Sequence, residues 1–391
     1  MSVRVAVVAE YYPRARDPVL GVWAHRQAVA ARDAGAEVRV LVLHRPIPPK
    51  AALRSRSPGK LVEPLRQPRR AELDGIEVRY VPFLAPPRPR SYGSWGAWAA
   101  PSLALALRRL RRSFPFDLVH AHYAAPAGDA VRRARLSQPL VVSVHGGDVL
   151  SVAEASPAGR RAVERALGQA RLVLANSEAI KRRCRALGAR ATRVVHLGTD
   201  LPSAPAREPR EPRLVTVGHL VARKRHADVL RALWLLRESH PAVRWVVVGD
   251  GPERAALERL ARDLDLAGRV ELRGQLPHDR AVAAARDASV FVLPSVDEAF
   301  GVAYVEAMAA GVPAIGCRGE PGPEEIAACG GGIRLVAPGD PEALAAELRG
   351  LLDEPRWRRE LGASARATVE ASFTWDGCGQ ATVAAYREAL G

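Results

Sequence analysis

The chain has 391 residues, of which 48% are hydrophobic and 26% are charged. At about 100–200 residues per domain, this length predicts two domains with separate cores, and the composition excludes a disordered polyelectrolyte. The net charge of +16 is uneven, because residues 1–200 carry 34 Lys and Arg against 15 Asp and Glu, whereas residues 201–391 carry 24 against 27.

The cysteines and the N-terminus bear on the cellular compartment. Four cysteines lie far apart and form no CxxC or Cys/His cluster: Cys184, Cys317, Cys329 and Cys378. They indicate neither a zinc site nor a disulfide framework and favour free thiols in a reducing cytoplasm. The N-terminal apolar run is too short for a signal peptide, and no stretch reaches the roughly 18 apolar residues of a membrane span. We expect a cytoplasmic protein, with any membrane contact peripheral at the inner face of the plasma membrane.

Short apolar runs alternate with helical patterns along the first half of the chain. Strands are predicted at residues 3–9, 37–43, 76–83, 117–121, 140–144 and 172–175. A helix is predicted at 20–34, and a later one where Leu103, Leu107, Leu110 and Phe114 share a face. The Pro- and Arg-rich stretch 45–70 is predicted to be a mobile surface loop.

The second half repeats this organisation. Strands are predicted at residues 214–217, 243–248, 270–272, 290–293 and 313–316. Apolar strands separated by helices indicate parallel sheets covered on both faces, so two series predict two doubly wound α/β domains. The Pro-rich segment 201–212 is typical of a linker, which gives domains at 1–200 and 213–372 and a closing segment at 373–391.

Several well-defined functional motifs are absent from the sequence. No GxGxxG follows the first strand, which argues against nicotinamide or flavin binding, and no GxxxxGK[ST] loop indicates a P-loop NTPase. HExxH, GxSxG and protein-kinase signatures are also missing, as are recognisable nucleic-acid-binding modules. We therefore expect no nucleic-acid partner.

The strongest signal lies in residues 290–316. A buried strand is followed by a loop with Glu298, a turn at Phe300 and Gly301, and a helix predicted at 301–310 that contains Glu306. A helix N-terminus offers unpaired N–H groups to a diphosphate, and glycine lets the backbone approach a ligand. Glu306 can accept hydrogen bonds from ribose hydroxyls, and Glu298 can reach a sugar beside the diphosphate.

Three more turns follow predicted strands. The segment Gly218–Lys224 contains Arg223 and Lys224, cations able to neutralise a departing diphosphate at the carboxyl end of a strand. A GDGP turn covers Gly249–Pro252. In the first half, His145 follows the fifth predicted strand.

Together these motifs resemble the retaining GT-B glycosyltransferases of family four, which build bacterial surface polysaccharides and glycolipids. The matching positions are Glu298 and Glu306 in an E-x7-E pattern, Gly218, Leu220 and Lys224 in G-x-L-x-x-x-K, the GDGP turn, Gly21, His145, and the closing Phe373-Thr374-Trp375. The resemblance covers nearly the whole chain. It implies two Rossmann-like domains facing across a cleft, with a C-terminal helix crossing back to the first domain.

The resemblance also implies roles for residues on both sides of the reaction. Glu298, His145, Lys224 and Arg223 would form the catalytic set, with His145 near the donor sugar. The nucleotide-sugar donor would be held by Glu306, Gly218, His219, Phe300, Gly301, Val302, Gly249, Gln275 and Leu276. The acceptor side would involve Gly21, His120, His122 and Asp148. UDP is the expected nucleotide, with GDP next, and the acceptor would be a glycan, a glycolipid or a small molecule. The resemblance also implies that no metal or other cofactor is needed, since the nucleotide sugar is a substrate.

The basic first half suggests an anionic partner such as a membrane surface or a phosphorylated acceptor, although Arg-rich compositional bias also accounts for part of the charge. The helix at 103–114 carries Arg108, Arg109, Arg111 and Arg112 beside its apolar stripe, with Trp95 and Trp98 expected to precede it. Such a helix can lie on an anionic membrane or can be an ordinary core helix with a basic outer face.

Two other functions remain open from the sequence. A nucleotide-sugar epimerase on the same fold would act on the donor without an acceptor. A non-catalytic polyanion binder would bind nucleic acid in a salt-sensitive way and would have no affinity for nucleotide sugars.

Overall fold

The fold is that of a computed structural model, which describes residues 2–48, 62–88 and 91–391. Residues 49–61, in the centre of the predicted 45–70 loop, lie outside the described residues. The chain divides into two compact units, the first formed by Met1–His196 with Trp375–Gly391 and the second by Leu197–Thr374.

The first unit is built on an eight-stranded sheet with the order β3-β4-β2-β1-β5-β6-β7-β8. All neighbouring strands are parallel except β3 and β4, which form an antiparallel edge. The central strands are β-branched and buried on both faces, as the alternating-helix pattern predicts. The strands are β1 (Arg4–Ala9), β2 (Glu37–His44), β3 (Arg70–Leu73), β4 (Ile76–Pro82), β5 (Leu118–His122), β6 (Leu140–Val144), β7 (Leu172–Ala175) and β8 (Thr192–Val194).

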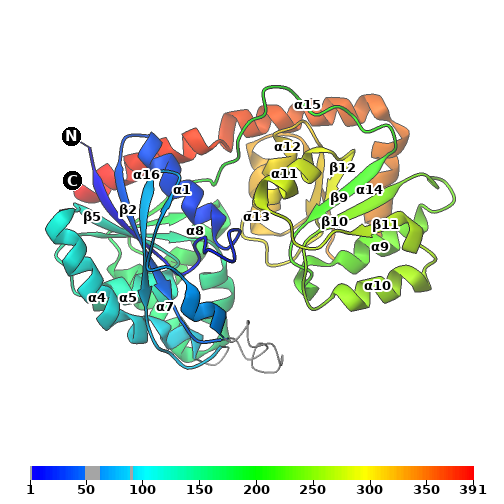
Figure 1. Ribbon diagram of the computed structural model, residues 1–391. Helices are drawn as coiled ribbons and strands as arrows, with labels where there is room; N and C mark the ends of the chain where they lie inside the picture. Colours follow the sequence, from blue (N-terminus) through cyan, green and yellow to red (C-terminus); the bar gives the residue numbers. More distant parts are fainter. Residues whose placement is uncertain (1, 49–61, 89–90) are drawn as a thin grey trace. The chain divides into compact units, whose positions relative to one another are not determined.

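Helices cover this sheet, and the last one comes from the end of the chain. They are α1 (Val22–Asp33), α4 (Trp95–Ser113), α5 (Asp129–Arg133), α6 (Ala153–Ala155), α7 (Pro157–Gln169), α8 (Glu178–Ala186) and α16 (Trp375–Leu390). Helix α16 lies along α1, as Figure 1 shows in red and blue. The two helices approach so closely that a Cβ on Gly379 would lie 2.2 Å from the Ala30 carbonyl oxygen. Glycine at this position therefore permits the contact.

The second unit has a six-stranded sheet in which all strands are parallel, with the order β11-β10-β9-β12-β13-β14. The strands are β9 (Arg213–Val217), β10 (Arg244–Val248), β11 (Val270–Leu272), β12 (Val290–Val292), β13 (Ala314–Cys317) and β14 (Ile333–Val336). The helices are α9 (His226–Leu235), α10 (Arg254–Asp263), α11 (His278–Arg286), α12 (Val302–Met308), α13 (Pro321–Cys329), α14 (Pro341–Asp353) and α15 (Pro355–Ser372). Trp245 is fully buried in its core.

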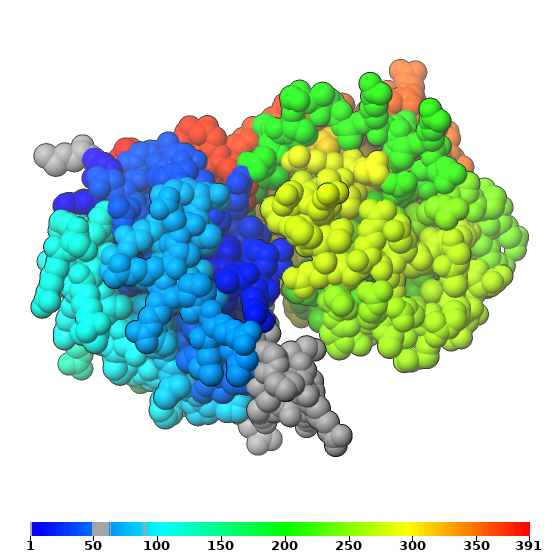
Figure 2. All heavy atoms as spheres, viewed as in Figure 1, coloured from blue at the N-terminus to red at the C-terminus, as the bar shows by residue number. Residues whose placement is uncertain are grey.

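The structure corrects several details of the predicted elements. Strands β3, β8 and β14 were not predicted, because they are short and partly exposed and lack a continuous apolar run. The predicted 45–70 loop contains a 3₁₀ helix at Glu63–Arg66 and the start of β3. Trp95 and Trp98 do not precede α4 but lie within its first turns. This helix lies at the surface of the first unit, drawn in cyan in Figure 2.

Candidate active site

The second unit has the strand order of a doubly wound nucleotide-binding sheet. Counted along the chain, its strands lie in the order 3-2-1-4-5-6, so the order reverses between β9 and β12. In open α/β sheets, ligands bind at the carboxyl ends of the strands beside such a switch point. Here the loop after β9 contains Arg223 and Lys224, and the loop after β12 contains Glu298.

Lys224 and Glu298 form a buried ion pair between these two loops. The Lys224 ammonium contacts Oε2 of Glu298, and both residues are only 8% exposed. The Ser295 hydroxyl donates to the same oxygen at 2.9 Å, and the Arg223 guanidinium lies 3.9 Å from it. Burial alone would raise the pKa of Glu298, but the attraction of Lys224 outweighs it and the pKa is lowered. Glu298 is therefore a carboxylate that holds Lys224 in place.

The backbone of Glu298 is also fixed. Its N–H donates to Glu320 Oε2 at 2.9 Å, and its carbonyl accepts from Gly322 N at 2.8 Å. Because a Cβ on Gly322 would lie 2.1 Å from the Phe300 carbonyl oxygen, this crossing needs glycine. Sequence reasoning missed Ser295 and Glu320, since neither belongs to a recognisable spacing pattern.

Gly301 turns the chain into α12 with φ 82° and ψ 66°, a left-handed conformation that favours glycine. The helix begins at Val302 and ends at Met308, shorter than the predicted 301–310. Within it, Glu306 is buried, and its Oε1 lies 3.6 Å from His278 Nε2. The Phe300 ring packs on Phe373 at 5.6 Å between centroids. The Phe300 ring therefore points into the core of the second unit, and its backbone belongs to the loop between β12 and α12.

The remaining donor-side residues lie on the loops after β9, β10 and β11. The Gly249 N–H donates to the Gly274 carbonyl at 2.8 Å, and a Cβ on Gly249 would lie 1.9 Å from the Gly218 carbonyl oxygen. These contacts bring the three loops together. His219 directly follows Gly218, and Gln275 and Leu276 directly follow Gly274, so all three share this edge of the sheet.

In the first unit, His122 ends β5 and His145 directly follows β6. His145 Nε2 lies 2.9 Å from His122 Nδ1, and the two rings are stacked. Burial lowers the pKa of His145 to about 3 and that of His122 well below its usual value, so both imidazoles are neutral at pH 7. His145 follows the sixth strand rather than the fifth, because β3 was not predicted. Its Nδ1 is buried and has no hydrogen-bond partner among the described residues.

The other predicted acceptor-side residues, His120 and Asp148, are both buried in the core of the first unit. His120 is fully buried, and its ring nitrogens lie 2.8 Å from the Tyr386 hydroxyl and 2.7 Å from the Ser143 hydroxyl, so it ties α16 to the sheet. Asp148 is also fully buried; it accepts from Ala124 N at 2.9 Å and from Gly146 N at 3.1 Å. Burial raises the pKa of Asp148 to about 6.

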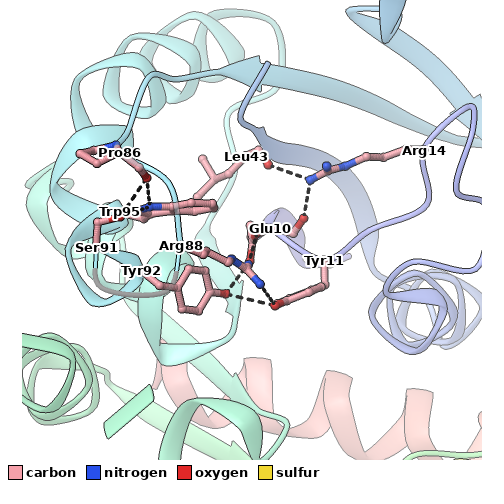
Figure 3. A network of polar contacts seen from close by, with 9 residues as sticks. All are labelled: Glu10, Tyr11, Arg14, Leu43, Pro86, Arg88, Ser91, Tyr92 and Trp95. Atoms are coloured by element: carbon pink, nitrogen blue, oxygen red, sulfur yellow. Dashed lines mark hydrogen bonds and ion pairs between the residues drawn. The ribbon is translucent and has the colours of Figure 1, made fainter. Parts of the chain in front are cut away.

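Gly21 has φ 66°, and a Cβ there would lie 2.2 Å from the Tyr11 carbonyl carbon. It thereby packs against the loop after β1. That loop carries a polar network that the sequence analysis did not identify, formed around Glu10 and Arg88 (Figure 3).

Comparisons with known proteins agree with this architecture. Residues 20–200 match the glycosyl transferase 4-like domain, and residues 200–368 match the family described as glycosyl transferases group 1. The chain therefore carries the two domains of a GT-B glycosyltransferase, and the predicted α/β fold class is confirmed.

Similar proteins include a Bacillus subtilis (strain 168) protein named as the teichuronic acid biosynthesis glycosyltransferase TuaC, 28% identical over 95% of both chains. Glycogen synthase of Mycobacterium tuberculosis is 28% identical over 98% of this chain and 94% of its own. Among solved structures, sucrose-phosphate synthase from Thermosynechococcus elongatus has a TM-score of 0.79 at 21% identity, covering 99% and 98% of the two chains. Anabaena HepE, solved with UDP and glucose, has a TM-score of 0.71 at 20% identity, covering 98% and 99%.

Proposed function

We propose that this protein is a retaining, metal-independent glycosyltransferase that transfers a sugar from a nucleotide-diphosphate sugar to an acceptor hydroxyl. The supporting observation is the buried Lys224–Glu298 pair at the switch point of the second sheet. A pair of this kind holds an ammonium group in place before the donor arrives, and Arg223 adds a second cation nearby. Two cations against one carboxylate leave a net positive charge for an anionic leaving group.

The donor is held by groups along the same edge of the sheet. Lys224 and Arg223 bind the diphosphate, and Glu306 accepts hydrogen bonds from the ribose hydroxyls. Gly218 leaves room for the ligand next to the backbone, because a Cβ there would meet no atom closer than 3.7 Å, and Gly249 lets its loop approach the Gly218 carbonyl. Glu298 orients Lys224 and borders the donor sugar.

In the reaction, the bond between C1 of the sugar and the diphosphate oxygen breaks while the acceptor oxygen bonds to C1 from the same face. The acceptor proton passes to a phosphate oxygen of the leaving diphosphate, so no protein base is required. Because Lys224 and Arg223 offset the growing negative charge, EDTA is expected to leave turnover unchanged. His145 is a neutral imidazole whose Nδ1 has no hydrogen-bond partner in the described part of the chain, and it contributes by position and polarity near the donor sugar.

UDP is the proposed nucleotide, and GDP is the second candidate. HepE was solved with UDP-glucose, which favours UDP. A relative from Mycolicibacterium smegmatis, 29% identical over 70% of this chain and 77% of its own, is named as a GDP-mannose-dependent mannosyltransferase. The acceptor would be a glycan or glycolipid of cell-surface polysaccharide synthesis, which is the field of the TuaC relative.

A thermal-shift panel of UDP, GDP, ADP, TDP and their sugars tests the donor site. One nucleotide family should stabilise the wild type, and Glu306→Ala should lose that shift. Glu258→Ala, which changes a half-exposed helical glutamate of the same unit, should keep it. Failure of every nucleotide to stabilise folded wild-type protein would contradict the proposal.

Peripheral binding to an anionic membrane on the cytoplasmic side also belongs to this proposal. One row of α4 is exposed along its length and combines apolar and basic side chains: Trp98, Pro101, Leu105, Arg108 and Arg112. Among the described residues, no helix is long and apolar enough to cross a bilayer. Flotation with anionic vesicles should recover the wild type and not Arg108→Glu/Arg112→Glu. Equal recovery on neutral and anionic vesicles would contradict membrane binding through this row.

A further inference from the structure

A cavity of about 340 Å³ opens in the first unit beside the loop after β1. This volume is at the lower end of the range for small-molecule sites, about 300–1,000 Å³. Its lining includes three tyrosines, one arginine and two serines: Tyr11, Tyr92, Tyr123, Arg88, Ser151 and Ser156. Tyr11 follows β1 and Tyr123 follows β5, and the strand order of the first sheet reverses between these two strands. The cavity thus occupies the position where open α/β sheets bind ligands.

Tyr123 has an unusual backbone conformation that keeps its ring at this site. Its φ of 77° is uncommon for a bulky residue, and such outliers cluster at functional sites. The ring lies 5.0 Å from that of Tyr11 and 5.5 Å from that of His145, measured between centroids. Tyr123 therefore connects the wall of the cavity to the histidine assigned above to the donor-sugar side.

The charge at the cavity is balanced by a fixed pair. Arg88 donates to Glu10 Oε1 at 2.8 Å and to the Tyr11 hydroxyl at 2.9 Å, and it stacks on the Tyr92 ring at 3.8 Å (Figure 3). The Tyr92 hydroxyl donates to the other oxygen of Glu10 at 2.6 Å. Both carboxylate oxygens are therefore engaged, so Glu10 neutralises Arg88 and is not available as a base.

This combination defines the chemistry of the ligand. Arg88 is the only charged side chain among the described residues that line the cavity, and its charge is already offset by Glu10. Aromatic faces pack on the C–H faces of a sugar ring, while tyrosine and serine hydroxyls and the remaining arginine N–H groups can bond its hydroxyls. A carboxylate or phosphate would have to compete with Glu10 for the guanidinium.

We propose that this cavity binds an uncharged hexose unit of the acceptor, with Arg88 and Tyr92 as positioning residues. The proposal rests on the transferase function inferred above and specifies its acceptor. It also assigns Glu10 a role in specificity, because removing its charge would leave Arg88 free to attract an anion.

The test measures binding of p-nitrophenyl hexosides, the matching p-nitrophenyl glucuronide and a hexose 6-phosphate to the full chain by ligand-observed NMR, with UDP present. Ser151→Trp fills the cavity from an exposed position, and Ser137→Trp, exposed on the same unit and not part of the lining, is its matched control. We expect Ser151→Trp to weaken hexoside binding at least tenfold and Ser137→Trp to leave it unchanged. Glu10→Gln keeps the shape of the side chain and should raise affinity for the anionic probes roughly tenfold.

Two results would overturn the cavity assignment: a wild type that prefers the glucuronide or the phosphate, or equal hexoside binding in the two tryptophan variants. The UDP-induced thermal shift, measured on each protein, reports separately on the donor site. Absence of a shift in the wild type with UDP and with every other nucleotide of the panel would refute the transferase proposal, while the hexoside comparison would still decide what the cavity binds.

Discussion

Removing the Lys224 side chain tests the electrostatic account of the donor loops most directly. Lys224→Ala leaves the buried Glu298 carboxylate with Ser295 and a guanidinium 3.9 Å away. Breaking a buried pair by removing one partner costs about 3–5 kcal/mol, and because Arg223 compensates in part, we expect about 3 kcal/mol at pH 7.5. The matched control is Lys181→Ala, whose partner Glu178 is half exposed, with an expected cost below about 1 kcal/mol.

The pH dependence of this cost provides a second criterion. In the wild type the pKa of Glu298 is lowered by folding, so its contribution to stability is present above the unfolded pKa and is lost as pH falls. Without Lys224, burial dominates and the pKa of Glu298 should instead be raised, so protonation relieves the buried charge as pH falls from 7.5 to 5. The cost of Lys224→Ala should therefore shrink at pH 5.

The stability of this unit is measured at both pH values by urea unfolding, with hydrogen exchange in peptides from β9 and β12 as the readout. A cost that is equal at pH 7.5 and pH 5, or no larger than that of Lys181→Ala, would refute the reasoning.

Three further predictions address other parts of the molecule. Because burial holds the pKa of His145 near 3, this residue should add no titration to the pH profile of kcat/KM between pH 5.5 and 8, and His145→Ala should lower kcat about 10–100-fold. A titration in this range that the wild type shows and the variant lacks would contradict this. Gly249→Ala would place a Cβ 1.9 Å from a carbonyl oxygen at φ 146°, so it should lower the free energy of unfolding by at least about 2 kcal/mol and raise the KM for the donor. Its control is Gly268→Ala, where a Cβ would meet open space and the free energy of unfolding should stay within about 0.5 kcal/mol of the wild type. Tyr386→Phe leaves His120 Nδ1 without its partner inside the core. It should lower the free energy of unfolding in urea by about 1–3 kcal/mol and leave kcat unchanged. A clear loss of kcat in the folded variant would mean that this contact also shapes the site.

The two sheets could be predicted because their central strands are buried on both faces and have apolar sequences. Three of the four edge strands, β3, β8 and β14, escaped prediction for the opposite reason. In β3, residues Arg70–Leu73 are exposed or half-buried, and in β8 all three residues are half-buried, so their sequences resemble those of turns.

The candidate site also contains residues that could be predicted from the sequence and residues that could not. Residues in local motifs, such as Glu298 and Lys224, could be identified from spacing, although only the fold shows that they contact each other across 74 positions. Glu10 and Arg88 are 78 positions apart, and Arg88 lies in a Pro-rich stretch with no periodicity. Their pairing depends on the order of the strands in the sheet, which cannot be predicted from a local sequence pattern.

Helix α16 has a consequence for the synthesis of the chain. Its residues Cys378, Val383 and Tyr386 belong to the same core as β1 and α1, at the opposite end of the sequence. On the ribosome, the N-terminal sheet must therefore wait for residues 375–391 to emerge before its core closes. The second unit, whose residues are continuous from Leu197 to Thr374, is fully translated before that moment. The usual order, in which the N-terminal domain folds first during synthesis, is thus reversed for the completion of this protein.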